Sequence, residues 1–384
     1  MSTLKKNSYL TQAKKAKNDE FYTKYHDIEK EMQSYLDFNP DVFRNKTILL
    51  PCDDPEWSNF TKYFAQNFQR LGLKKLISTS FAASSKPAGF VYQPSLFEQS
   101  DERFDPELSL KQGKIFTLTH DKSGDGKINI DDLEWKYLKG DGDFRSDEVK
   151  KLRDQADIII TNPPFSLFRE FLAWVIEADK QFAMIGNMNA ITYKESFSLI
   201  RDNRLWLGAT NFNQGMYFRV PDNFVYASTY KFEREQYGQK VNRVPGVCWF
   251  TNIEHGRRHE PLSLMTMADN QKFNKKIVGK NAYQQYENYN AIEIPFTDAI
   301  PNDYTGEMGV PISFLDKYNP DQFEIIGLGI SNSGIEFGVQ PYKPEHKKYR
   351  KEIQKRGAVD GDLYMMIDGE VKVPYARIII KHKS

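Results

Sequence analysis

The sequence contains little cysteine and has no long apolar run. Cys52 and Cys248 are its two cysteines in 384 residues, widely separated and with no CxxC pair. This argues against a zinc site and a disulfide framework, and it fits a reducing cytoplasm. No apolar segment approaches the roughly 18 residues that a membrane span needs, and the lysine-rich N-terminus lacks the apolar core of a signal peptide. We therefore expect a soluble, cytoplasmic protein.

The chain also lacks an excess of charge of either sign. Its formal net charge is +1, so nucleic-acid binding would have to come from a local patch. Such a patch occurs near the C-terminus, where residues 341–384 hold eleven Lys and Arg against six Asp and Glu. A phosphate-contacting module needs this concentration of positive charge. The residues that we predict to bind DNA are Lys347, Lys348, Arg350, Lys351 and Arg356.

A GxGxxG motif is absent, so the sequence does not predict a nicotinamide site. Its place after the first predicted strand, 46–50, is taken by the turn Pro51-Cys52-Asp53-Asp54, and a helix is expected over 59–71. The two adjacent carboxylates can receive the amino group of a cofactor. Alternatively, they only favour the start of the helix through its dipole.

The turn Asn162-Pro163-Pro164-Phe165 has the most informative pattern in the chain. It follows a short apolar run rich in β-branched residues at 156–160, which predicts a buried strand, and precedes a helical pattern at 166–176. Ligands bind at this edge of open α/β sheets. The prolines stiffen the turn, Asn162 and a backbone carbonyl can accept the two hydrogens of a nucleobase amine, and Phe165 can stack on an extruded base. The alternative is a rigid turn with a core phenylalanine.

Alternating strands and helices continue to about residue 258. Strands are expected at 76–81, 182–187, 205–208 and 246–252, with helices before and between them, the first capped by Thr23. This alternation predicts an α/β fold with helices on both faces of the sheet. Beyond it, short strands separate Pro-, Gly- and Asn-rich turns. We therefore expect one domain over 1–258 and a smaller mixed α+β domain over 259–384. The aromatic- and amide-rich insertion 209–243 suits contacts to DNA bases, or equally a protein interface.

Two further loops could bind ligands. Gly140-Asp141-Gly142-Asp143-Phe144 allows a tight turn in which Asp143 accepts from an amino group and Phe144 lies against a purine, or it is simply the turn before a helix capped by Ser146. The segment 121–132 resembles a calcium loop through Asp121, Ser123 and Asp125, but its twelfth residue is Asp and no entering helix precedes it. A hairpin turn explains the same residues. We predict no metal site and keep the calcium loop as the alternative.

These motifs together resemble the EcoRI methylase family of adenine-specific DNA methyltransferases. Asn162-Pro163-Pro164-Phe165 matches the family's catalytic motif, and Phe21-Tyr22-Thr23 resembles the motif that touches the methionine part of S-adenosylmethionine. Pro51 to Asp54 stand where the glycine-rich cofactor loop normally lies, and Gly142-Asp143-Phe144 resembles the element that holds the cofactor's adenine. The resemblance implies a Rossmann-like, S-adenosylmethionine-dependent methyltransferase sheet in a catalytic domain over 1–258, with a DNA-contacting insertion at 209–243. It implies a target-recognition domain that binds DNA over 259–384. No clear acid ends the strand at 76–81 to hold the ribose.

The implied activity is transfer of a methyl group from S-adenosylmethionine to N6 of a flipped-out adenine in double-stranded DNA, by direct in-line displacement. The implied partner is duplex DNA, together with a restriction endonuclease that shares the site without being bound. Alternative substrates are cytosine N4, an RNA base or a protein glutamine, although cytosine enzymes tend to have Ser at the position of Asn162. A non-catalytic DNA- or calcium-binding protein on the same scaffold is the alternative from another class.

Overall fold

The computed structural model describes residues 22–53, 58–82, 101–210, 212, 215–219, 232–234 and 240–383. The predicted site residues Phe21 and Asp54 lie outside this part of the chain. Within it, no helix is both long and apolar enough to cross a membrane. The chain divides into two compact units: Met1–Ala190 with Leu207–His255, and Ile191–Trp206 with Gly256–Ser384. The segment 191–206, which we expected within the N-terminal domain, is thus grouped with the C-terminal residues.

The first unit is built on a mixed sheet with the strand order β5-β4-β3-β2-β6-β7-β12-β8. β2 pairs in parallel with both β3 and β6, and β6 pairs in parallel with β7. The chain runs from β2 outward to β3 and later returns to β6 on the other side of β2. The strand order therefore reverses at β2, and ligands bind at such a point in open α/β sheets. The strands of this sheet are β2 (Thr47–Leu50), β3 (Lys75–Ser80), β4 (Lys114–Leu118), β5 (Glu134–Tyr137), β6 (Ile158–Thr161), β7 (Gln181–Asn187), β8 (Trp206–Leu207) and β12 (Val247–Thr251).

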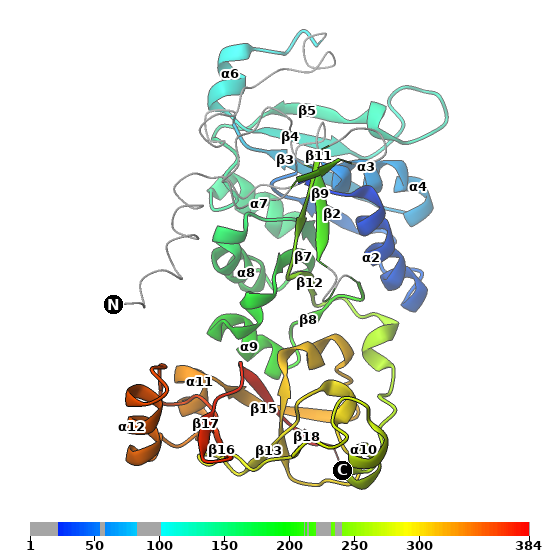
Figure 1. Ribbon diagram of the computed structural model, residues 1–384. Coiled ribbons are helices and arrows are strands. Elements are labelled where there is room, and N and C mark those ends of the chain that lie inside the picture. Colours follow the sequence, from blue (N-terminus) through cyan, green and yellow to red (C-terminus); the bar gives the residue numbers. More distant parts are fainter. Residues whose placement is uncertain are drawn as a thin grey trace. The chain divides into compact units, whose positions relative to one another are not determined.

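Helices cover both faces of this sheet, as the α/β prediction requires (Figure 1). Ile48 and Leu50 point into one core cluster, whereas Leu49 between them is equally buried but lies outside that cluster. Strand side chains alternate between faces, so burial of all three means that the sheet is covered on both sides. Figure 1 shows α2, α3 and α4 on one side of it and α7 and α8 on the other. The helices of this unit are α2 (Tyr25–Phe38), α3 (Asn59–Gln66), α4 (Phe68–Leu71), α6 (Pro106–Lys111), α7 (Asp147–Gln155) and α8 (Phe168–Glu177), with 3₁₀ turns η2 (Ile130–Asp132), η3 (Phe165–Leu167) and η4 (Met188–Thr192).

Two of the expected helix starts can be compared with the structure. Ser146 caps α7 by accepting a hydrogen bond from the Val149 backbone N–H, as predicted. The prediction that Thr23 caps the first helix was wrong: the N-cap of α2 is Lys24, which makes no capping bond. Thr23 instead ends the two-residue strand β1 (Tyr22–Thr23), and α2 begins two residues later, at Tyr25.

That strand belongs to a small antiparallel sheet with the order β1-β9-β11-β10. β1 (Tyr22–Thr23) pairs with β9 (Met216–Arg219), so residues near the N-terminus lie beside part of the expected insertion 209–243. The other two strands are β10 (Phe232–Arg234) and β11 (Lys240–Val244). The remainder of the insertion lies largely outside the described residues.

The second unit has no strand–helix alternation, as expected beyond residue 258. Its main sheet has the order β13-β14-β18-β15, with β13 and β14 parallel and the other pairs antiparallel, and a separate hairpin joins β16 to β17. The strands are β13 (Ala291–Glu293), β14 (Glu307–Pro311), β15 (Phe323–Gly329), β16 (Met365–Ile367), β17 (Glu370–Lys372) and β18 (Arg377–His382). The helices are α9 (Lys194–Arg201), α10 (Met267–Phe273), α11 (Ser331–Glu336) and α12 (Pro344–Glu352), with 3₁₀ turns η5 (Gly256–His259), η6 (Thr297–Ala299) and η7 (Ile312–Lys317).

Candidate active site

The carboxyl ends of β2 and β6 bring two of the predicted motifs together. Thr161, the last residue of β6, is completely buried. Its hydroxyl lies 2.5 Å from the Pro51 carbonyl oxygen and 2.6 Å from Oδ2 of Asp53. One hydroxyl thus bridges the turn after β2 to the start of the Asn162–Phe165 turn. The two motifs, far apart in sequence, therefore adjoin at the sheet edge.

The turn Pro51–Asp53 has a backbone conformation that normally favours glycine. Cys52 has φ +73°, in the left-handed region. Asp53 is only 6% exposed, and its Oδ1 accepts a hydrogen bond from the Ser58 hydroxyl at 2.8 Å. Ser58 in turn caps α3 by accepting from the Phe60 backbone N–H. The Asp53 carboxylate therefore ties the turn both to β6 and to the first turn of α3.

The N-terminal motif is attached to the same helix. Asn59, the first residue of α3, donates from Nδ2 to the Thr23 carbonyl oxygen at 2.7 Å. Thr23 is 3% exposed, and its buried hydroxyl has no hydrogen-bond partner among the described residues. A buried polar atom without a partner is unusual in a native fold and costs free energy. A ligand that hydrogen-bonds this hydroxyl would satisfy it. Of Tyr22 only the backbone, in β1, is described.

The loop that contains Gly142 and Asp143 packs against the end of β3, on the other side of β2. The Ala82 backbone N–H donates to the Asp141 carbonyl oxygen at 2.8 Å. Gly142 has φ +88°, and a Cβ at this position would overlap the Ser80 carbonyl oxygen. The neighbouring Gly113 is equally confined, since its Cβ would lie 2.5 Å from the same oxygen. Only glycine fits both positions, which fixes the path of the loop.

Asp143 and Phe144 have different surroundings. Both carboxylate oxygens of Asp143 accept from the Arg145 guanidinium, at 2.9 and 2.6 Å, and Arg145 also reaches Glu170 at 2.9 Å. The Phe144 ring is 1% exposed and packs edge-on against Phe171 and Trp174 of α8. In this structure the Phe144 ring is part of the core and has no exposed face on which a purine could lie. An aromatic residue next to an acid in the sequence is therefore equally compatible with a core position.

The Asn162–Phe165 turn lies at the surface of this edge. Asn162, Pro164 and Phe165 are partly exposed, and Pro163 is buried. The Pro164 carbonyl accepts from the Leu167 backbone N–H at 2.9 Å, which closes η3. Phe165 packs along the main core cluster without being fully enclosed by it. The strand end therefore carries the Asn162 amide, whose Oδ1 is itself buried, and part of the Phe165 ring.

Sequence reasoning missed Glu31, which holds this region together from α2. Glu31 is completely buried, and its carboxylate accepts from the Tyr35 hydroxyl, from the backbone N–H groups of Ala209 and Thr210, and from the Thr210 hydroxyl. Burial raises the pKa of Glu31 above its ordinary value. A Cβ on Gly208 would overlap the same carboxylate. Glu31 therefore joins α2 to the segment after β8. Its neighbours Glu29 and Lys30 are also charged, so the sequence gave no signal that this one carboxylate is buried.

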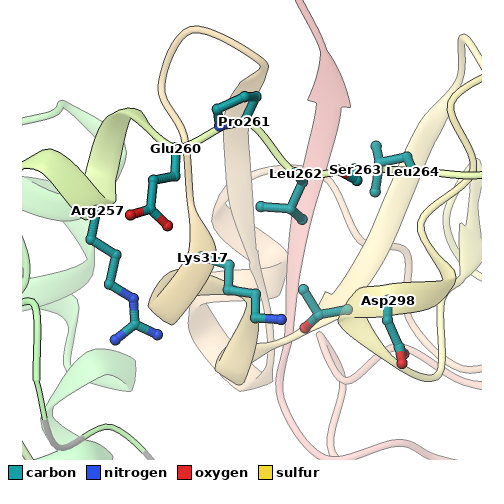
Figure 2. A pocket seen from close by; sticks show the side chains of 9 residues that line it. Arg257, Glu260, Pro261, Leu262, Ser263, Leu264, Asp298 and Lys317 are labelled. Carbon is teal, nitrogen blue, oxygen red and sulfur yellow. The ribbon is translucent and has the colours of Figure 1, made fainter.

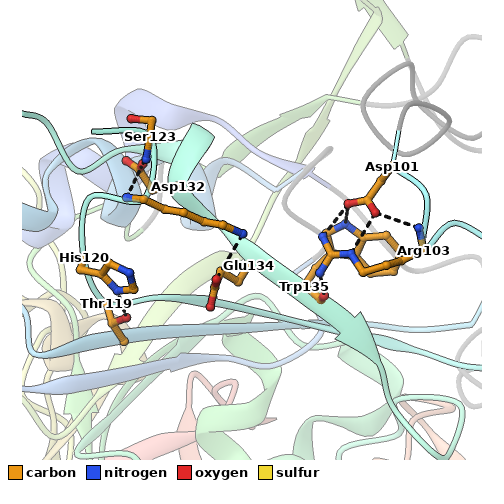
Figure 3. A network of polar contacts seen from close by, with 9 residues as sticks. Asp101, Arg103, Thr119, His120, Ser123, Asp132, Glu134 and Trp135 are labelled. Carbon is orange, nitrogen blue, oxygen red and sulfur yellow. Dashed lines mark hydrogen bonds and ion pairs between the residues drawn. The ribbon is translucent and has the colours of Figure 1, made fainter. Parts of the chain in front are cut away.

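The segment 121–132 forms the connection of the antiparallel pair β4–β5, as the hairpin interpretation expects (Figure 3). Asp121 accepts from the backbone N–H groups of Gly126 and Gly124, which lower its pKa. Asp125 accepts from the Lys127 N–H. Asp132 is 1% exposed and accepts from three backbone N–H groups, those of Lys122, Ser123 and Asn129.

Ser123 donates its hydroxyl to Asp121 as well, so the polar groups of the loop bind one another. In the part of the chain that the structure describes, no group of three or more His, Cys, Asp or Glu side chains is arranged to hold a metal ion. The carboxylates of this loop stabilise its backbone.

The predicted DNA-binding residues divide into two classes on and after α12. Lys347 pairs with Asp360 at 2.5 Å, and Arg350 donates from Nε to the Gly357 carbonyl oxygen at 2.8 Å. These two side chains are partly buried and have structural partners. The others are exposed, with no ion pair within the described chain: Lys348, Lys351 and Arg356. Arg350 and Arg356 also line a hollow of about 410 Å³ beside β17.

A second hollow in this unit, of about 320 Å³, is shown in Figure 2. Arg257 and Lys317 line it together with Glu260 and Asp298, and Arg257 is paired with Asp316 at 2.6 Å. Burial raises the pKa of Asp316 despite this pairing. Neither hollow contains a residue of the predicted methyl-transfer site.

Comparison with known proteins agrees with the motifs. The family described as "Adenine-specific methyltransferase EcoRI" matches residues 9–383. The chain is 38% identical over 379 residues to the type II methyltransferase M.EcoRI of Escherichia coli. The aligned region covers 98% of this chain and 97% of that protein. It is 36% identical over 322 residues to the type II methyltransferase M.MpnI of Mycoplasma pneumoniae (83% and 85%) and 35% identical over 319 residues to M.MgeORF184P of Mycoplasma genitalium (83% and 85%). No solved structure matches. The chain therefore belongs to the EcoRI family of adenine-specific DNA methyltransferases.

Proposed function

We propose that the protein transfers the methyl group of S-adenosylmethionine to N6 of an adenine that has been flipped out of duplex DNA. The single observation that carries this proposal is the Thr161 hydroxyl, which bridges the Pro51–Asp53 turn to the Asn162–Phe165 turn. A cofactor turn and an amine-accepting turn must adjoin for methyl transfer, because the reacting atoms have to lie about 3–3.5 Å apart in line.

The residues that would hold S-adenosylmethionine are those of the N-terminal motif, the turn after β2 and the Gly142 loop. The Thr23 hydroxyl, buried and without a partner in the described part of the chain, supports this assignment because a ligand at this point would satisfy it. The left-handed turn at Cys52 and the glycine-only loop at Gly142 allow close approach of a ligand to the backbone. Asp53 and Asp143 supply the carboxylates. When bound, the cofactor supplies a methyl group already activated on a sulfonium.

On the DNA side, Asn162 and the Pro163 carbonyl would accept the two hydrogens of the adenine amine. This would free the nitrogen lone pair, which is otherwise delocalised into the ring, for in-line attack. Phe165 would stack on the extruded base, which offsets part of the few kcal/mol that flipping costs. The exposed cations Lys348, Lys351 and Arg356 would contact phosphates.

Sequencing of modified bases in DNA from cells that express the protein tests the proposal. We expect 6-methyladenine at one short sequence, absent from cells that express Asn162→Ala. Asn162→Ala should still bind S-adenosylmethionine, as measured by calorimetry on the purified protein. Methylcytosine in place of methyladenine, or unchanged methylation with Asn162→Ala, would refute the assignment. Protection of the same sequence from a restriction endonuclease would support the paired endonuclease.

A further inference from the structure

The end of α10 and the turn that follows it form a basic surface distinct from α12. Residues 270–281, which we call the α10 turn, contain four lysines and no acidic residue. The four are Lys272, Lys275, Lys276 and Lys280, and all are exposed. On a chain whose net charge is +1, this is a strong local concentration of positive charge.

The α10 turn has a defined backbone. Asn274 is 8% exposed and donates from Nδ2 to the Asn270 side chain and to the Asp298 carbonyl oxygen, at 3.2 and 3.1 Å. Its own Oδ1 accepts from the Lys276 backbone N–H at 3.1 Å, and its carbonyl accepts from Ile277 and Val278. These bonds hold the turn in one conformation, so its lysines project from fixed positions.

Aromatic rings lie among these lysines. Phe273, the last residue of α10, is 59% exposed, and Phe296 is 37% exposed. The ammonium of Lys272 lies 5.0 Å from the Phe273 ring, and those of Lys276 and Lys280 lie 5.4 and 5.9 Å from the Phe296 ring. An exposed ring set among cations offers a stacking face to a base beside groups that can bind phosphates.

Most of the lysines of the α10 turn have no ion-pair partner in the part of the chain that the structure describes. Lys276 pairs with Asp298 at 2.7 Å, beside the hollow in Figure 2. Lys272, Lys275 and Lys280 form no ion pair within the described residues. Lysine is depleted from the centre of protein–protein interfaces, whereas uncompensated lysines with an exposed aromatic residue suit a phosphate backbone and its bases.

We infer that the α10 turn is a second DNA contact of this enzyme. Lys272, Lys275 and Lys280 bind phosphates of the duplex, and the Phe273 ring lies against a sugar or base edge between them. Lys276, already paired with Asp298, contributes less. This inference rests on the proposed function, since it takes duplex DNA as the partner.

The test is equilibrium binding of the full-length protein to a duplex that carries the methylated sequence, by fluorescence anisotropy over a series of salt concentrations. The triple variant Lys272→Gln, Lys275→Gln, Lys280→Gln should bind more weakly and lower the slope of log affinity against log salt by up to about 2.7, because each phosphate contact contributes about 0.9. The matched control is Lys74→Gln, Lys111→Gln, Lys151→Gln, which removes the same charge from exposed lysines of the first unit and should change the slope far less.

Phe273→Ala should weaken binding at least about fivefold at an unchanged slope, because a ring contact releases no counterions. Equal slopes for the two triple variants would overturn the inference, and wild-type affinity of Phe273→Ala would overturn the assignment of the ring. If the wild-type protein methylates its DNA while the two triple variants bind alike, the α10 turn is not a contact but the proposed function stands. If the wild-type protein neither binds nor methylates DNA, the proposed function itself fails.

Discussion

Replacement of Thr161 by valine tests the link between the two halves of the site. Valine has nearly the same shape, so the substitution removes the hydroxyl and leaves the packing of β6 intact. The hydroxyl lies 2.5 Å from the Pro51 carbonyl and 2.6 Å from the Asp53 carboxylate, and both Thr161 and Asp53 are buried. The turn after β2 would keep the Ser58 bond but lose its connection to β6.

The expected size of the effect follows from the burial of these groups. Loss of a donor to a buried acceptor costs about 1–3 kcal/mol, and more when the acceptor is charged. We therefore expect Thr161→Val to lower the free energy of unfolding by about 2 kcal/mol, measured by urea denaturation. The misplaced turn should also bind the proposed cofactor more weakly. We expect a loss of about 1.4 kcal/mol in binding free energy, which corresponds to a tenfold higher KM for S-adenosylmethionine.

Thr161→Ser is the matched control because it keeps the hydroxyl and loses only a methyl group. It should retain the wild-type KM for S-adenosylmethionine, even if packing makes it somewhat less stable. If the hydroxyl only stabilised the fold, Thr161→Val would have a lower unfolding midpoint, but its KM for S-adenosylmethionine would equal that of Thr161→Ser. Equal KM values for Val and Ser would refute the reasoning that this hydroxyl positions the cofactor turn.

Other substitutions have equally definite outcomes. Gly142→Ala should lower the unfolding free energy by about 3 kcal/mol, because φ is +88° and its Cβ would overlap a backbone carbonyl; Gly140→Ala, whose Cβ meets no atom within 4 Å, should leave a urea midpoint almost unchanged. Because the pKa of Glu31 is raised, its contribution to stability is fully present below the ordinary value of 4.5 and is lost as the pH rises through the raised value. The stability difference between wild type and Glu31→Gln, from urea unfolding at several pH values, should therefore shrink above about pH 4.5, and a constant difference would contradict the direction of the shift. Lys348→Gln with Lys351→Gln should reduce the salt dependence of DNA affinity by about 1.8 for two lost phosphate contacts, and an unchanged slope would remove α12 from the interface.

The strand–turn–helix units of the first unit were predictable because their patterns are local. The β-branched run at 156–160 became β6, and the apolar residues of 59–71 became α3 and α4. The turns after β2 and β6, which we predicted as site motifs from their residues, adjoin at one sheet edge. The α/β class and the smaller mixed second unit are confirmed by the fold.

Contacts between distant segments could not be predicted in the same way. Glu31 occupies a helix on which charged residues normally face solvent, and its partners Ala209 and Thr210 lie far along the chain. The sequence likewise cannot distinguish which of several neighbouring lysines has a partner: Lys347 has Asp360, whereas Lys348 beside it is exposed. Both depend on tertiary packing and not on local propensity.

The pairing of β1 with β9 has a consequence for how the enzyme folds during synthesis. Thr23 pairs with Phe218, so most of the first unit separates the two partners in sequence. The N-terminal motif must wait until β9 has left the ribosome, while the neighbouring β2–α3–β3 segment can form from contacts already available. Closing so long a loop costs chain entropy, and the two-residue strand β1 contributes only a few hydrogen bonds to offset that cost. β1, which we propose to border the methyl donor, is therefore completed late. A nascent or truncated chain that ends before β9 would also lack β12 and the core residues Val247 and Trp249, so its main sheet would be incomplete as well.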